Sequence, residues 1–119
     1  MQDFRKLQVW RKAHELTLAI YSATKNFPVE EQFGLRSQMR RASSSIGINI
    51  AEGCGRTSQP ELRRYLRVSM GSASELEYEL LLARDLDLIT ERQHEQLSGQ
   101  VVEIKKMATA LVRKLRTEN

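Results

Sequence analysis

The sequence predicts an all-α fold, an antiparallel up-down-up-down four-helix bundle formed by a single domain of residues 1–119. Apolar residues recur at spacings of three and four along four separate segments, which is the pattern of an amphipathic helix. Short turn signals separate these segments, so consecutive helices are expected to be antiparallel neighbours. With 40% hydrophobic residues and two prolines, the chain suits a helix-rich protein that buries a core without disulfides or metal.

The first two helices are expected on either side of a proline turn. The first spans about residues 5–25, with apolar positions at Val9, Ala13, Leu16, Ile20, Ala23 and Phe27. Pro28 ends it because proline biases the preceding residue away from helical angles. Glu30 and Glu31 favour the start of the second helix, since acidic side chains complement the helix dipole. This helix reaches about Glu52, with apolar positions at Phe33, Leu35, Met39, Ala42, Ile46 and Ile50.

Two glycines follow the second helix. Gly53 and Gly55 accept positive φ and are therefore expected to end the helix at a sharp corner. The helix before this corner is unusually light, because serines, alanines and Gly47 occupy many of its positions. Ser69, Ser72 and Ala73 make the next helix light as well. Such faces let neighbouring helices approach closely.

Capping boxes mark the start of the third and fourth helices. Ser58 and Glu61 have this spacing, as do Thr90 and Gln93. The apolar positions of the third helix are Leu62, Leu66, Ser69, Ala73, Leu76, Leu80 and Ala83, and those of the fourth are Leu97, Val101, Ile104, Ala108, Leu111 and Leu115. Leu81, Leu82 and Leu86 widen the apolar face of the third helix, so its C-terminal half is expected to be its most buried part.

A mostly polar stripe follows one side of the second helix. Steps of four and three from Gln38 lead through Ala42 and Ser45 to Asn49 and Glu52. Polar groups beside an apolar face need partners if they are buried, so they either fix the register of two helices or line a site. We favour a structural network, whose predicted members are Gln38, Ser45, Asn49, Glu52 and Glu75.

The charge of the chain suggests an anionic partner. The formal net charge is +4, and bases cluster along the second, third and fourth helices. The candidate nucleic-acid-binding residues are Arg36, Arg40, Arg56, Arg63, Arg64 and Arg67. If the glycine corner places their segments side by side, the guanidinium groups share one surface suited to phosphate. The alternative is an ordinary solvated face.

A second basic cluster, from Lys105 to Arg116, is ranked below these arginines because Glu103 and Glu118 dilute it. Aromatic residues make up only 6% of the chain and form no stripe on which bases could stack. We therefore expect nucleic-acid contacts to be electrostatic.

The search for catalytic or metal-binding residues gives negative results. Two histidines and one cysteine are too few for a zinc site, and no nucleophile has a base at a recognisable spacing, so we expect no enzyme activity, metal or cofactor. Cys54 is either a reactive thiol beside Arg56 or a small residue packed in a turn. A lone cysteine favours a reducing compartment, and neither a signal pattern nor an apolar run of membrane-spanning length is found. A cytoplasmic protein without a membrane partner is expected.

Four motifs together resemble a known family. They read Phe4-x-x-Leu-x-Val-Trp10, Phe27-Pro28-x-x-Glu31-x-Phe33-Gly34-Leu35-x-x-Gln38, Ser45-Ile46-x-x-Asn49-Ile50-Ala51-Glu52-Gly53-x-Gly55-Arg56 and Gly71-Ser72-x-x-Glu75-Leu76. The sequence resembles the four-helix-bundle family of 23S ribosomal RNA intervening-sequence proteins, whose members are similar to the accessory variability-determinant protein of diversity-generating retroelements.

This resemblance implies a ring-shaped homopentamer whose basic surface binds nucleic acid, RNA or DNA, and it transfers no catalytic residues. Two alternatives stay open. One is a structural module that binds a protein partner. The other is an enzyme or small-molecule-binding bundle that uses Gln38, Asn49, Glu52 and Glu75.

Overall fold

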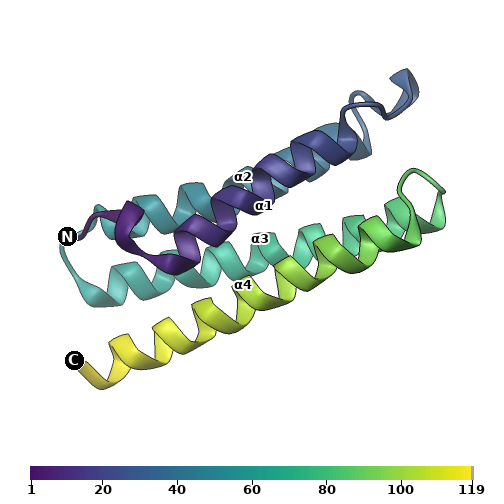
Figure 1. Cartoon of the computed structure of the whole chain (residues 1–119). Coiled ribbons are helices and arrows are strands. Elements are labelled where there is room, and N and C mark those ends of the chain that lie inside the picture. Colours follow the sequence, from purple (N-terminus) through teal and green to yellow (C-terminus); the bar gives the residue numbers. More distant parts are fainter. Residues whose placement is uncertain (119) are drawn as a thin grey trace.

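The structure is an elongated bundle of four antiparallel helices. This computed structural model describes the backbone of residues 1–118 and the side chains through Arg116. Its long helices are α1 (Gln8–Thr24), α2 (Leu35–Cys54), α3 (Gln59–Asp85) and α4 (Glu91–Glu118), and two short 3-10 helices cover Phe4–Lys6 and Val29–Glu31. Each long helix packs on the next in the chain, and α4 also packs on α1 (Figure 1). The predicted fold class is confirmed.

The shape follows from helix length and short turns. The molecule measures 47 × 22 × 19 Å, so its long axis is set by α3 and α4. Both chain ends and the α2–α3 corner lie at one end, whereas the α1–α2 and α3–α4 connections lie at the other (Figure 1). None of the described helices combines the length and apolar character needed to cross a membrane.

The core is built from the predicted apolar positions. Leu16, Ile20, Ile46, Leu66 and Leu80 are all fully buried. Full burial of one such side chain contributes about 1.5–3 kcal/mol to folding. The three-and-four spacing therefore identified the inward face of every long helix.

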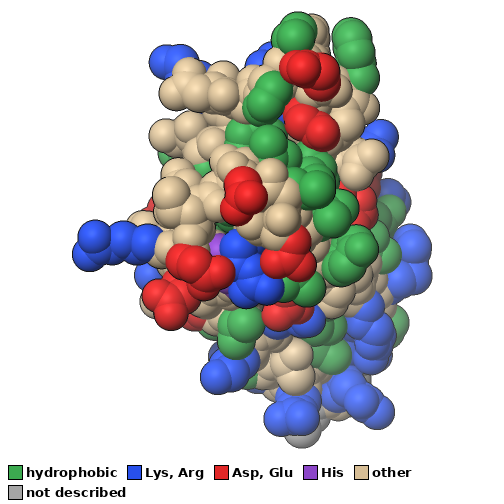
Figure 2. Space-filling view, turned by 90° about the vertical axis from the view of Figure 1, so that its right-hand side faces the viewer, with side chains coloured by type: hydrophobic (Ala, Val, Ile, Leu, Met, Phe, Trp, Pro, Cys, Tyr) green, Lys and Arg blue, Asp and Glu red, His purple; other side chains and the backbone are tan. Residues whose placement is uncertain are grey.

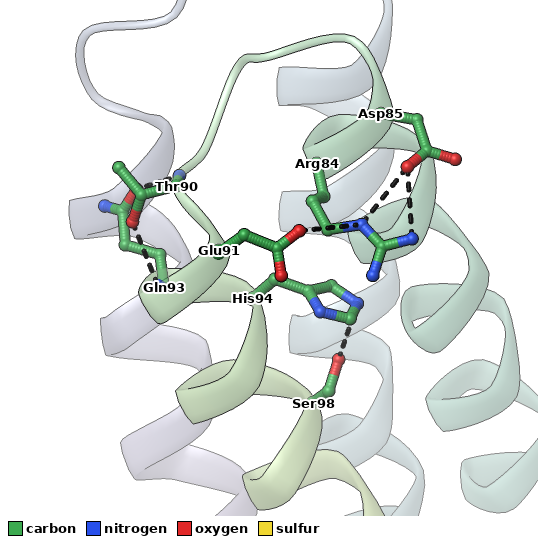
Figure 3. A network of polar contacts seen from close by, with 7 residues as sticks. All are labelled: Arg84, Asp85, Thr90, Glu91, Gln93, His94 and Ser98. Carbon is green, nitrogen blue, oxygen red and sulfur yellow. Dashed lines mark hydrogen bonds and ion pairs between the residues drawn. The ribbon is translucent and has the colours of Figure 1, made fainter.

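Both predicted capping boxes stand at helix starts. Ser58 Oγ accepts a hydrogen bond from the Glu61 amide at 3.3 Å. Thr90 and Gln93 bond reciprocally, with the Thr90 amide 2.8 Å from Gln93 Oε1 and the Gln93 amide 3.0 Å from Thr90 Oγ1 (Figure 3). These bonds satisfy amides that the first helical turn leaves without partners.

The start of α2 differs from the prediction. Glu30 and Glu31 lie in a 3-10 turn, and α2 begins only at Leu35, whose amide donates to Glu31 Oε1 at 2.9 Å. Phe33 therefore precedes the helix and does not join its apolar face. Its side chain is 87% exposed, so its predicted core position is wrong.

The corner after α2 also differs from the prediction. No glycine in the described chain has positive φ, and Gly53 lies inside α2. A Cβ at Gly53 would lie 2.8 Å from Tyr65 Cβ and 3.0 Å from Leu62 Cδ1. A glycine is required at position 53 because α3 approaches α2 closely there, and not because position 53 has a positive φ.

The C-terminal half of α3 is its most buried part, as predicted, because five residues from Ala73 to Ala83 are buried against three in the first half. Leu80 and Ala83 are buried, but Tyr78, Leu81 and Leu86 are 63%, 37% and 53% exposed. The predicted widening of the apolar face is wrong for Leu81 and Leu86, because one helix face is enough to fill the bundle core. These two leucines face outward, whereas Leu82 packs against the core.

Candidate nucleic-acid interface

The first turns of α3 lie beside the last turns of α4. Their contact is fixed by Arg63, whose Nη1 donates to the Leu115 carbonyl oxygen at 3.3 Å. Leu115 belongs to the end of α4, where carbonyl groups have no partner within the helix. Arg64 and Arg67 are exposed on the same turns of α3. This antiparallel contact brings two basic segments of the sequence together.

The α4 segment adds further positive charge. Residues 105–116 include five bases and no acid, although Lys105 is paired with Glu77 at 3.0 Å. Figure 2 views the molecule from the end that holds the α1–α2 and α3–α4 connections, and Lys and Arg side chains gather in its lower part. We call the first turns of α3 together with the last turns of α4 the basic end and define it as Arg56, Arg63, Arg64, Arg67, Arg113, Lys114 and Arg116. Sequence reasoning ranked the α4 cluster second, yet antiparallel packing places the two clusters at the same end.

Tyr65 contacts the guanidinium groups of two of these arginines. Arg56 Nη2 donates to Tyr65 Oη at 2.8 Å, and the Arg56 and Arg64 guanidinium carbons lie 5.1 and 4.6 Å from the centre of its ring. Arg64 also pairs with Glu61 at 3.9 Å. Cation–π contacts of this kind hold guanidinium groups in place and keep their charge.

The other predicted arginines lie elsewhere. Arg40 is separated from the last residue of α2 by about 21 Å along the helix axis, at 1.5 Å per residue. Its Nε donates to Thr24 Oγ1 at 2.9 Å and its Nη2 to the Tyr21 carbonyl oxygen at 3.1 Å. Arg36 lies one turn closer to the start of α2. The six candidate arginines therefore do not share one surface within a single chain.

The predicted polar network is formed by part of its members. Asn49 Nδ2 donates to the Ser45 carbonyl oxygen at 2.8 Å and to Ser45 Oγ at 3.0 Å. Ser45 Oγ lies 2.9 Å from Ser72 Oγ of α3, so these bonds join α2 to α3. Gln38 and Glu52 are exposed, and neither side chain takes part in the hydrogen bonds found among the described residues.

The α2–α3 seam also contains a buried carboxyl group that sequence reasoning missed. Glu79 is 5% exposed, and its Oε1 has no hydrogen-bond partner. Burial raises the pKa of Glu79 to about 7, helped by the charge of Glu75 and a hydrogen bond with it, while Arg41 opposes the shift. The signal was available, because Glu79 follows Leu76 by three residues and precedes Ala83 by four.

Two other candidates have structural explanations. Cys54 is buried, and its burial raises the pKa of the thiol, which disfavours the reactive thiolate. At the α3–α4 turn, Arg84 lies between Asp85 and Glu91, and the His94 ring lies 3.2 Å from Ser98 Oγ (Figure 3). These contacts fix the turn. No cluster of metal-ligating side chains occurs among the described residues.

Comparisons with known proteins identify the family. The model of the 23S rRNA-intervening sequence protein family matches residues 5–110. The chain belongs to the 23S rRNA-intervening sequence protein family. No curated protein matches the sequence.

A solved structure supports the same assignment. It is a crystal structure of a protein of unknown function from the S23 ribosomal protein family of Bacteroides thetaiotaomicron VPI-5482. The two chains are 28% identical with a TM-score of 0.79, over 87% of this chain and 97% of the other. The match covers most of this 23S rRNA-intervening sequence protein, so the two chains share the four-helix-bundle fold.

Proposed function

We propose that this 23S rRNA-intervening sequence protein is a non-enzymatic bundle that binds RNA or DNA electrostatically through its basic end. The observation that carries this proposal is the convergence of α3 and α4 at that end. Exposed guanidinium groups suit phosphate, and no aromatic side chain of the basic end lies open for stacking, because Tyr65 is covered by Arg56 and Arg64. Binding is expected to depend little on sequence.

We further propose that five copies form a closed ring, as the family resemblance implies. The outward apolar side chains support self-association, since Leu18, Ile48 and Tyr78 are 58%, 61% and 63% exposed. A ring would multiply a modest charge per chain into a multivalent surface. The buried, free Cys54 agrees with action in the cytoplasm.

A salt series tests the binding proposal. Structured RNA and duplex DNA should both bind at low salt and weaken steeply towards physiological salt, because each neutralised phosphate adds about 0.9 to the slope of log affinity against log salt on duplex DNA. Light scattering on the same sample tests the ring. Absence of binding at low salt would reject the nucleic-acid function, and a monomer at micromolar concentration would reject the ring.

The exposed apolar residues of α3 favour a second candidate, a module that binds another polypeptide. Tyr78 and Leu86 supply an apolar surface that the bundle itself does not cover. Under this alternative, nucleic acid does not bind at low salt, and Tyr78→Ser weakens protein association. The small-molecule alternative has less support, because Gln38 and Glu52 are exposed.

A further inference from the structure

A hollow lies between the end of α1 and the start of α2, at the opposite end of the bundle from the basic end. Its volume is about 460 Å³, and its lining includes Tyr21, Phe33, Arg36, Arg40 and Arg41. Three arginines and two aromatic rings thus meet around one open space, and no acidic side chain lines it. We call this space the arginine hollow.

The guanidinium groups of the hollow differ in their availability. Arg40 is held against α1 by its bonds to Thr24 and Tyr21, and its guanidinium carbon lies 4.5 Å from the centre of the Tyr21 ring. Arg36 has no hydrogen-bond or ion-pair partner for its side chain within the described chain. Glu31 lies nearby in sequence, but its carboxylate accepts the Leu35 amide and is absent from the lining. Arg36 therefore offers an unpaired guanidinium that suits a phosphate.

The aromatic rings add a second kind of recognition. Phe33 is 87% exposed in the turn before α2, where it fills no part of the core. Arg40 lies over one side of the Tyr21 ring, and Tyr21 is 45% exposed, so Phe33 is the more open of the two rings of the hollow. An exposed ring beside the unpaired guanidinium of Arg36 matches a ligand that carries both a flat base and a phosphate.

We propose that the arginine hollow binds one nucleotide, with its phosphate at Arg36 and Arg41 and its base stacked on Phe33. The proposal takes its class of ligand from the proposed function but uses a different surface and a different mode of recognition. The basic end contacts backbone phosphates alone, whereas the hollow also contacts a base. A free mononucleotide and one unit of a single strand share this chemistry.

NMR titration of the full chain tests the proposal with adenosine monophosphate, adenosine and inorganic phosphate. Adenosine monophosphate should shift the amides of residues 32–41 and bind roughly tenfold more tightly than either part, because it gains base stacking over phosphate and an ionic contact over adenosine. Phe33→Ala should reduce its affinity to that of phosphate, and Arg36→Met should weaken both anions. Val29→Ala, which truncates another exposed apolar residue before α2, is the matched control.

Three outcomes would overturn the proposal: equal affinity for phosphate and adenosine monophosphate, unchanged nucleotide binding by Phe33→Ala, or no saturable binding by the parent protein. Thermal melting checks that each variant folds. A short single-stranded oligonucleotide separates the two sources of ligand. Tighter binding that Phe33→Ala weakens supports a unit of a strand, and affinity equal to the mononucleotide supports a free nucleotide.

The basic end supplies the control that separates the two proposals. An Arg64→Glu, Arg67→Glu variant should keep the affinity of the hollow for adenosine monophosphate. If duplex DNA fails to bind the parent protein while the mononucleotide binds, the proposed function fails and the hollow stands. If duplex DNA binds the parent protein but the mononucleotide does not, the nucleotide site in the hollow is rejected and the proposed function stands.

Discussion

The basic end and the arginine hollow use the same residue type in different ways. Each region contains one arginine that caps the C-terminal end of a neighbouring helix. Arg63 donates to the Leu115 carbonyl oxygen at the end of α4, and Arg40 donates to the Tyr21 carbonyl oxygen near the end of α1. The last carbonyl groups of a helix lack partners within that helix and carry partial negative charge. A guanidinium group from an adjacent helix can therefore bind them.

The surroundings of these two arginines differ. Around Arg63 the neighbouring bases come from two helices, whereas Arg40 stands beside Phe33 and Tyr21 in a hollow. The comparison shows that an arginine in a basic cluster is not automatically a ligand-binding residue. The carbonyl groups within its reach decide how much of its hydrogen-bonding capacity is left.

The largest expected effect comes from reversing charge at the basic end. Arg64→Glu with Arg67→Glu should weaken duplex DNA binding by about a hundredfold at ~50 mM salt, since two phosphate contacts together contribute about 1.8 to the salt slope. This double variant leaves Arg63 unchanged, because the guanidinium of Arg63 caps the end of α4 by donating to the Leu115 carbonyl oxygen. Fluorescence anisotropy over a salt series measures the change.

Lys25→Glu with Arg92→Glu makes the same charge change at the opposite end of the bundle. It should reduce duplex affinity far less. Equal losses in the two double variants would mean that net charge alone governs binding, and the distinction between the two regions would disappear.

The next effect concerns the corner that positions the basic end. Gly53→Ala should destabilise the fold by about 1–3 kcal/mol, because the new methyl group overpacks the contact with Tyr65 and Leu62. Gly71 lies inside α3, and a methyl group added there would meet nothing within 4 Å, so Gly71→Ala should stabilise by about 0.5–1 kcal/mol. Urea unfolding compares the two. The close-packing role of Gly53 is refuted if both variants gain stability.

A third effect tests the α2–α3 seam beside Arg41 through its pH dependence. The pKa of Glu79 is raised in the folded state from an ordinary 4.5 to about 7. The folded state therefore binds the proton more tightly, so the stability from Glu79 is fully present below about pH 4.5 and is lost as pH rises through about 7.

Glu79→Gln, which mimics the protonated side chain, should remove this part of the pH dependence. The difference in unfolding free energy between parent and variant should change by up to about 3 kcal/mol across the range, since one pKa unit corresponds to about 1.4 kcal/mol. Urea unfolding at a series of pH values measures it. Parallel pH profiles for the two proteins would contradict a proton held at this seam, where Glu75 and Arg41 are the charged neighbours.

The smallest effect separates two arginines of the hollow. Arg40→Met keeps much of the side-chain length but loses the bonds to Thr24 and Tyr21, so it should cost about 1 kcal/mol. Arg36→Met removes no such bond and should change stability by less than about 0.5 kcal/mol. Thermal melting compares them. Similar losses would show that Arg36 is also structural and would weaken its assignment as a phosphate ligand.

The sequence alone determined the helices and their inward faces. Spacings of three and four placed Leu16, Ile46 and Leu80 in the core, and the Thr90–Gln93 box marked the start of α4. These features depend on residues close in sequence, whose geometry is set by a helix of 3.6 residues per turn. The motif around Asn49 and Gly53 also indicated the family.

Only the tertiary structure decided which charges meet and which side chains stay exposed. Local pattern could not tell that Phe33 falls in the turn before α2, that Gly53 is needed for contact with Tyr65, or that Arg40 binds α1. It also could not place Arg63 beside Leu115, which is distant in sequence. These outcomes depend on the packing of antiparallel helices. The partners of a side chain then come from another segment of the chain, and the residue spacing within its own segment does not reveal them.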